Sequence, residues 1–227
     1  MKRKMMFMIS ALILSGCSLP MGEERGCPPD IVIEWVDAVK VNDIQYMSLD
    51  PGNYTVADND RGDSLGEVTY MMDGNACTDH QMRNGDAAFL AVGTEIYEFN
   101  GYKPSFRVIA DGNVYEVQVN DGADTIGELY DIEGKVQGMS VRSSYDGSHV
   151  MDLKEEHWRA FIDEFVRLEY VGFDAIYKEY GNEEGTFLDI HLKDGSSVRI
   201  NYWTEANVLN PGAFGNEKML EIISLYK

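Results

Sequence analysis

Histidine, cysteine and basic residues are all scarce in this chain. Its 227 residues include 4 His, 3 Cys and 19 Lys or Arg against 39 Asp or Glu, for a formal net charge of −20. The histidines, His80, His149, His157 and His191, form no HExxH or HxH pattern and no ligand set with cysteine, so the sequence predicts no metal and no cofactor. Because no stripe of Lys and Arg is present to displace phosphate counterions, nucleic acid is not expected as a partner.

No apolar run near the N-terminus is long enough to span a bilayer as a helix, which takes roughly 20 residues. The apolar run from Met5 to Leu14 has ten residues, and Lys2, Arg3 and Lys4 precede it. A basic start followed by a short apolar run is typical of a signal peptide. We therefore predict that residues 1–16 are a signal peptide and that the rest of the chain folds outside the cytoplasm.

The residues at the end of this run decide the predicted localisation. Leu14-Ser15-Gly16-Cys17 resembles the lipobox of bacterial lipoproteins, in which the cysteine thiol receives a diacylglyceryl group and becomes the first residue after cleavage. The resemblance implies that Cys17 carries acyl chains such as palmitate, and two chains hold a protein firmly at a membrane. We expect a lipoprotein on the extracytoplasmic face of the cell membrane. The alternative is an ordinary secretory signal whose cysteine happens to lie at the cleavage site.

Two cysteines remain once Cys17 is lipidated. Cys27 and Cys77 would then lie in an oxidising compartment, where disulfides form and persist. We therefore predict a disulfide between Cys27 and Cys77. Two unpaired thiols are the alternative.

The composition after the signal peptide predicts two folded domains. Apolar residues make up 44% of the chain, which allows one large domain or two of about 100 residues each. Residues 17–29 have the Gly, Pro and charge content of a tether, and Gly and acidic residues mark residues 122–134 as a linker. We therefore predict a β domain over residues 30–121 and an α+β domain over residues 135–227.

Turn residues between alternating apolar runs predict hairpins in the first domain. The Asn-Asp pair at 42–43 and the Asp-Gly pair at 111–112 each suit a two-residue turn. The second turn places Arg107 opposite Glu116 as one ion pair among apolar pairs. Further strands are predicted over residues 65–72, 87–92 and 94–99.

Several short segments of the first domain resemble a recurrent segment of uncharacterised lipoproteins from spore-forming Gram-positive bacteria. They are residues 41–46 (VNDIQY), 65–68 (LGEV), 85–90 (GDAAFL), 92–97 (VGTEIY) and 101–107 (GYKPSFR). The resemblance covers residues 30–120 and implies a lipoprotein with a β domain. No functional residue follows from it.

The second domain is predicted to have the element order ββαβββα, so the whole chain is α+β with an all-β, hairpin-rich domain first. Its first helix would begin at Asp152, with Glu155 completing a capping box. Asn216 would cap the last helix. A three-residue loop would place Leu192 opposite Val198. The predicted strands cover residues 135–143, 149–151, 175–178, 187–192 and 197–203.

Four aromatic residues of the second domain are candidates for binding a glycan or a protein partner. They are Tyr177, Tyr180, Tyr202 and Trp203. Tyrosine and tryptophan dominate interface hot spots, and the alternation that buries Tyr202 turns Trp203 to the other face of its strand. Burial in the core is the alternative for aromatic residues at strand spacing.

An acidic loop carries a weak calcium signal. Asp58, Asp60 and Asp63 lie in this loop, but Gly62 stands at position 5 of an EF-hand loop, Asp63 at its obligatory Gly position and Thr69 at its bidentate Glu position. A cluster of solvated turn residues is the alternative.

These features favour a lipid-anchored surface protein that is not an enzyme and that binds a protein or cell-wall partner. One alternative is a hydrolase whose site combines distant residues such as His191, His157 and loop carboxylates, because triads are defined by geometry and not by order. A second alternative is a module that binds a cation or a small ligand weakly.

Overall fold

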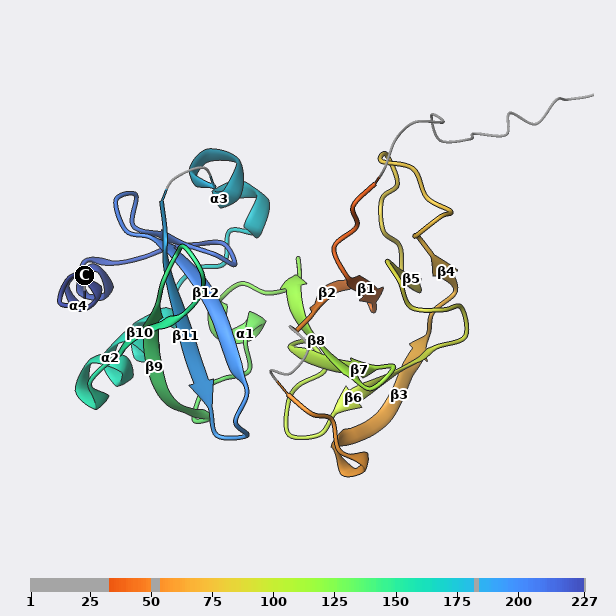
Figure 1. Cartoon of the computed structure of the whole chain (residues 1–227), viewed down its shortest axis with the longest axis horizontal. Coiled ribbons are helices and arrows are strands. Elements are labelled where there is room, and N and C mark those ends of the chain that lie inside the picture. Colours follow the sequence, from red (N-terminus) through yellow and green to blue (C-terminus); the bar gives the residue numbers. More distant parts are fainter. Residues whose placement is uncertain (1–32, 50–53, 182–183, 227) are drawn as a thin grey trace, which may run out of the picture. The chain divides into compact units, whose positions relative to one another are not determined.

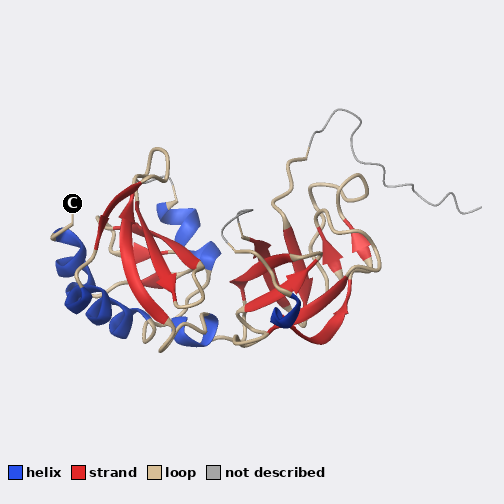
Figure 2. Ribbon diagram, turned by 60° about the horizontal axis from the view of Figure 1, so that its bottom comes forward, coloured by secondary structure: helices blue, strands red, loops and turns tan. Residues whose placement is uncertain are grey.

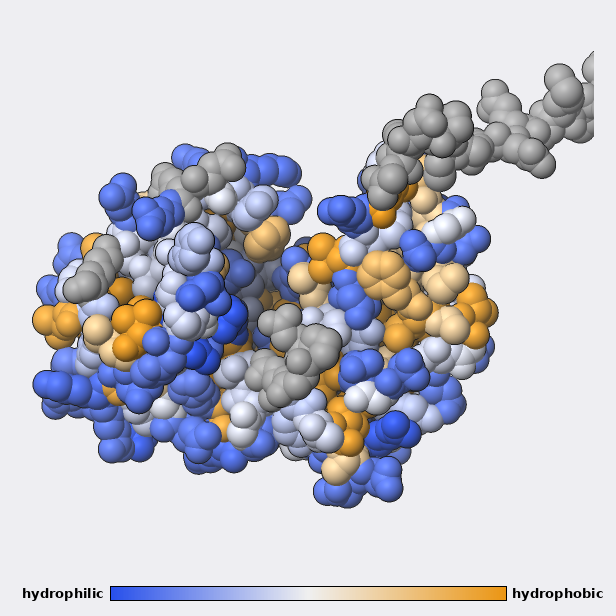
Figure 3. Space-filling model, viewed as in Figure 1, coloured by the Kyte–Doolittle hydropathy of each residue, from blue (hydrophilic) through white to orange (hydrophobic). Residues whose placement is uncertain are grey.

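The computed structural model describes residues 33–49, 54–181 and 184–226 (Figure 1). This part of the chain is mostly β, with two sheets and four α-helices, in agreement with an α+β class. Most of the surface drawn in Figure 3 is hydrophilic, as expected from a net charge of −20. The predicted signal peptide, Cys17, the tether and Cys27 all lie outside the described residues.

The first sheet has eight strands in the order β3-β6-β7-β8-β2-β1-β5-β4. In that order they are β3 (Arg61–Glu67), β6 (Glu95–Phe99), β7 (Arg107–Ala110), β8 (Asn113–Val119), β2 (Ile44–Ser48), β1 (Ala38–Val41), β5 (Asp86–Ala87) and β4 (Tyr70–Met71). Both predicted hairpins are confirmed, β1 with β2 and β7 with β8. Their turn residues all have positive φ, the conformation that a type I′ turn needs.

Two strand predictions in the first sheet are wrong in extent. The apolar run 87–92 was expected to form one buried strand, but β5 ends at Ala87 and the side chains of Phe89 and Val92 are exposed. The strand predicted over residues 65–72 is divided between β3 and β4, and β3 begins at Arg61, inside a segment without a strand prediction. Short apolar runs do not distinguish a strand from a partly buried loop.

The second sheet has six strands in the order β10-β9-β11-β12-β13-β14. They are β10 (His149–Asp152), β9 (Val136–Arg142), β11 (Thr186–Leu192), β12 (Ser197–Trp203), β13 (Val208–Leu209) and β14 (Ala213–Phe214). The four α-helices are α1 (Ile126–Leu129), α2 (Glu155–Phe165), α3 (Phe173–Tyr180) and α4 (Glu217–Ser224). Figure 2 shows the longer helices lying against this sheet.

The observed helices differ from two of the predictions and agree with a third. Residues 175–178 belong to helix α3 and not to a strand, so the predicted order ββαβββα is wrong at this point and at β13 and β14. Asp152 ends β10, and α2 begins after Lys154 without a side-chain cap, so the predicted capping box is absent. Asn216 does cap α4, accepting a hydrogen bond from the backbone N–H of Met219.

One hydrophobic core connects the two sheets. Its buried side chains come from the first sheet, from α1, from the second sheet and from α2 and α4. Aromatic rings mark the connection, because Phe106 contacts Tyr130 and Tyr130 contacts Phe165, with centroids 5.5 and 6.3 Å apart. Residues 122–134, which are predicted as a linker, contain α1 and contribute Ile126 and Leu129 to this core.

The two faces of the second sheet differ in chemistry. Alternate residues of β11 and β12, such as Leu188, Ile190 and Ile200, lie in the core. Their neighbours point to the opposite face, because successive strand residues alternate. That face carries Asp189 on β11 and Arg199 on β12 and is the surface that positions the candidate site.

Candidate functional site

A cleft of about 490 Å³ lies against the polar face of the second sheet. One group of lining residues comes from strands β2 and β8 and the residue after β2, with residues 47–49 and 116–118. The second sheet contributes Arg142, Ser197, Asp189 and Arg199, and Phe173, Tyr130, Asn210 and Pro211 complete the lining. Its volume is in the range of 300–1,000 Å³ that is typical of small-molecule sites.

Two arginines share one buried carboxylate in this cleft. Arg142 donates from Nε to Oδ2 of Asp189 at 2.6 Å, and Arg199 donates from Nε to Oδ1 at 2.8 Å and from Nη2 to Oδ2 at 3.2 Å. Asp189 is 1% exposed. Burial by itself would raise the pKa of Asp189, but the hydrogen bonds and charges of Arg199 and Arg142 outweigh it and hold that pKa below its usual value. The carboxylate therefore stays ionised at neutral pH.

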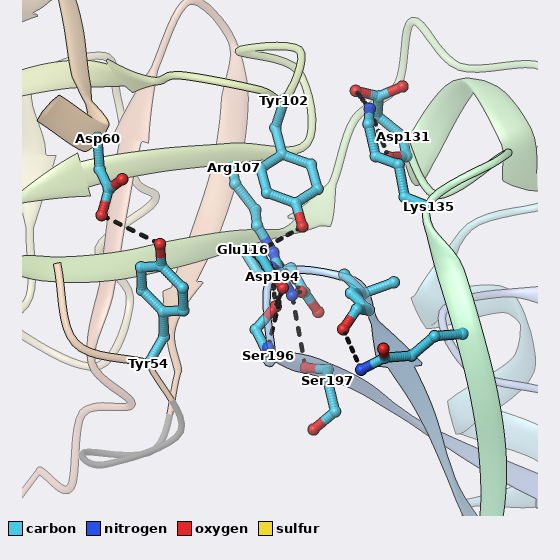
Figure 4. A network of polar contacts seen from close by, with 12 residues as sticks. Tyr54, Asp60, Tyr102, Arg107, Glu116, Asp131, Lys135, Asp194, Ser196 and Ser197 are labelled. Atoms are coloured by element: carbon cyan, nitrogen blue, oxygen red, sulfur yellow. Dashed lines mark hydrogen bonds and ion pairs between the residues drawn. The ribbon is translucent and has the colours of Figure 1, made fainter. Parts of the chain in front are cut away.

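A second arginine network adjoins the cleft through Glu116, which is one of the lining residues (Figure 4). Arg107 is 0% exposed and donates from Nε and Nη2 to Oε2 of Glu116, at 2.9 and 2.6 Å. Its Nη1 donates to Oγ of Ser196 at 2.7 Å, on the turn between β11 and β12. Burial raises the pKa of Glu116, although the charge and hydrogen bonds of Arg107 oppose the rise.

The same network reaches a tyrosine of the first half of the chain. The hydroxyl of Tyr102 donates to Oδ2 of Asp194 at 2.6 Å, and Asp194 accepts from Ser196. The guanidinium carbon of Arg107 lies 5.0 Å from the ring centroid of Tyr102 and 4.8 Å from that of Phe106. Nη1 of Arg107 also lies 3.8 Å from Oδ2 of Asp194. The guanidinium is therefore held between two carboxylates, a hydroxyl and two aromatic faces, which suits a planar cation.

Sequence reasoning found one part of this arrangement and missed the other. The cross-strand pair of Arg107 and Glu116 is confirmed. The Asp189 cluster was missed because the predicted pairing of β11 with β12 was wrong by two residues. The hairpin closes between Leu192 and Ser196, one position before the predicted loop, and so places Ile190 and not Leu192 opposite Val198. In this register Asp189 lies directly opposite Arg199.

The predicted aromatic surface does not form. Tyr202 lies in the core, and Trp203 is 3% exposed because Ile176 of α3 and Val208 pack against it. Tyr180 packs against the same small cluster, while Tyr177 is 51% exposed. The alternation that turns Trp203 away from Tyr202 is as expected, but a helix covers that end of the face.

The histidines of the predicted hydrolase site lie in separate pairs. His191 Nε2 is 2.9 Å from Oγ of Ser140, and His157 Nδ1 is 2.6 Å from Oη of Tyr226. A serine and a histidine within hydrogen-bonding distance are the start of a nucleophilic site. Ser140, however, is 0% exposed on β9, which is flanked by β10 and β11, so its hydroxyl does not meet a substrate in this conformation.

The last predicted site residues are the aspartates of the acidic loop and the two cysteines of the predicted disulfide. Asp60 accepts hydrogen bonds from the Tyr54 hydroxyl and from the backbone N–H of Ala57, so its carboxylate supports the loop. In the described part of the chain no three His, Cys, Asp or Glu side chains form a group that could hold a metal, and Asp58, Asp60 and Asp63 are no exception. The bridge between Cys27 and Cys77 stays a prediction, because Cys27 is not among the described residues.

Comparison with known proteins adds no family to this geometry. No protein-family model, curated protein or solved structure matches the chain. Over residues 33–49, 54–181 and 184–226, no helix is both long and apolar enough to cross a membrane. The chemistry of the site is therefore argued from its own residues.

Proposed function

We propose that this protein is a lipid-anchored, extracytoplasmic binding protein whose ligand occupies the cleft at Asp189. The anchor is supported by the basic start, the short apolar run and the Leu14-Ser15-Gly16-Cys17 sequence. The fold consists of a β part followed by an α+β part, which is supported by the division of the strands, with β1–β8 in one sheet and β9–β14 in the other. The ligand would come from the cell wall or from a protein partner at the cell surface.

The observation that carries the binding proposal is the charged cluster in the cleft. Asp189 holds two guanidinium groups in fixed orientations inside a concave site. Polar groups that are oriented before the ligand arrives reduce the ordering cost of binding. A few such groups within a partly apolar lining are the usual composition of a small-molecule site.

The anchor is tested by labelling. Cells that express the wild-type chain, Cys17→Ala or the neighbouring control Ser18→Ala are grown with labelled palmitate. We expect the wild type and Ser18→Ala to incorporate label and Cys17→Ala to incorporate none, because the thiol is the acceptor. Equal labelling of Cys17→Ala would show that the acyl chains, if any, are attached elsewhere.

Occupancy of the cleft is tested by blocking it. Gln118 lines the cleft from β8, and Gln45 is a similarly half-buried residue of β2 outside the lining. The ectodomain is mixed with an extract of the source cell envelope and repurified, and the small molecules that it retains are identified by mass spectrometry. We expect the wild type and Gln45→Trp to retain a ligand and Gln118→Trp to lose it. Retention by none, or by all three with both variants folded, would contradict binding in the cleft.

A further inference from the structure

The donor groups of Arg142 are only partly used within the protein. An arginine side chain has five N–H donors and no acceptor. Among the described residues, Arg142 donates from Nε to Asp189, and no acceptor is found there for its Nη1 and Nη2 groups. Its side chain is 24% exposed and lines the cleft. Four N–H donors are therefore available to a ligand in the cleft.

The charge around Asp189 favours an anion. Arg142 and Arg199 place two guanidinium groups beside the ionised carboxylate of Asp189, in a chain whose formal charge is −20. The other carboxylate of the lining, Glu116, is paired with Arg107. A negative ligand group is therefore attracted to the partly exposed guanidinium of Arg142 and not to the acidic surface of the chain, which repels anions.

The apolar residues of the lining indicate that the ligand also has an apolar part. Met47, Leu49, Val117, Phe173 and Pro211 supply apolar atoms to the cleft. A guanidinium in a cleft with apolar walls forms stronger charge-assisted hydrogen bonds than it does in open water. Planar, two-pronged donation from an arginine matches the oxygens of a carboxylate or a phosphate.

We infer that the cleft binds a small anion, in which a carboxylate or phosphate group is held by Arg142 beside Arg199 and a short apolar chain lies along the wall. This inference rests on the proposed function and names its ligand class. The fixed orientation of both guanidinium groups by Asp189 makes recognition depend on the shape of the anionic group and not on charge alone.

The test uses four probes with the same six-carbon chain: hexanoate, hexyl phosphate, hexanol and hexylamine. Binding to the ectodomain is measured at constant ionic strength by saturation-transfer NMR. We expect hexanoate or hexyl phosphate to bind at least about tenfold more tightly than hexanol or hexylamine, which corresponds to about 1.4 kcal/mol. Preference for one anion over the other distinguishes a carboxylate ligand from a phosphate ligand.

Variants identify the residue that binds the anion. Arg142→Gln should weaken binding of the preferred anion about tenfold or more, and Arg142→Lys should restore part of it because it keeps the charge but not the planar donor pair. Arg159→Gln is the matched control, because Arg159 pairs with Glu155 on the outer face of α2. Thermal melts show whether each variant is folded.

The outcomes separate this inference from the proposed function. Binding of hexanol as tight as that of the preferred anion, binding of no anion, or unchanged affinity in folded Arg142→Gln would each overturn the inference. If the envelope extract yields a neutral ligand that Gln118→Trp loses, binding in the cleft stands and its anionic character fails. If Gln118→Trp retains the envelope ligand, the proposed function fails whatever the probes do.

Discussion

Arg107→Met should destabilise the fold by about 3–5 kcal/mol, the usual cost of removing one partner from a buried ion pair. The side chain of Arg107 is 0% exposed, and its loss leaves the carboxylate of Glu116 without its only ionic partner among the described residues. Methionine has a similar length, so the cavity is small and the main effect is the uncompensated charge. Urea denaturation followed by circular dichroism gives the change in the free energy of unfolding.

Two further variants show whether the destabilisation by Arg107→Met comes from the unpaired charge of Glu116. Arg61→Met removes an exposed arginine of β3 and should change the free energy of unfolding by no more than about 0.5 kcal/mol. The double variant Arg107→Met with Glu116→Leu should recover most of the loss, because replacing both charges by apolar groups is often neutral or stabilising. A double variant as unstable as Arg107→Met would assign the effect to the lost contacts with Ser196 and the aromatic rings.

The loss caused by Arg107→Met should depend on pH. Burial raises the pKa of Glu116 in the folded protein, so the folded state binds a proton more tightly than the unfolded chain does. For such a group the stability falls as the pH rises from the unfolded pKa, about 4.3 for Glu, through the folded pKa. Without Arg107 nothing opposes this rise, so the deficit of the variant should be smallest near pH 4 and should grow toward neutral pH.

The parts of the fold that could be predicted are those with a local cause. A two-residue turn with positive φ at both positions fixes the register of the two strands that it joins. The turns at 42–43 and 111–112 have this geometry, and the strands beside each turn pair in the predicted register. The pair of Arg107 with Glu116 follows from the second of these turns. Asn216 could be identified as a cap because its hydrogen bond is to a residue only three positions away.

The parts that were missed depend on distant residues. Ser196, which covers Arg107, is 89 positions away in the chain, so nothing local indicated that this arginine is buried. Trp203 is covered by α3, although the sequence predicts a strand over residues 175–178 of this helix. The Asp189 cluster could be predicted only from the correct register of β11 with β12. Moving the three-residue loop by one position shifts the pairing by two residues, which leaves the same side chains on the buried face, so the apolar alternation did not distinguish the two registers.

Phe106→Ala should destabilise the whole described fold by about 3–5 kcal/mol and not one sheet alone. Phe106 is buried between Tyr102 and Tyr130, with ring centroids 5.5 Å from each, and Tyr130 leads on to Phe165 of α2. A residue at the junction of a continuous core is part of one cooperative unit. Hydrogen exchange in increasing urea should therefore show β7–β8 and β11–β12 losing protection together, in the wild type and in the variant.

The control for Phe106→Ala is the same substitution at a surface position. Phe89 is 48% exposed beyond the end of β5, so Phe89→Ala should cost much less, within about 0.5 kcal/mol. Two independently folding domains predict a different pattern, in which Phe106→Ala lowers the protection of the first sheet and leaves β11–β12 unchanged. In a shared core, removal of a central ring weakens the packing on both sides. Protection lost in the first sheet alone would therefore show that the rings from Phe106 to Phe165 are in contact but do not couple the stability of the two sheets.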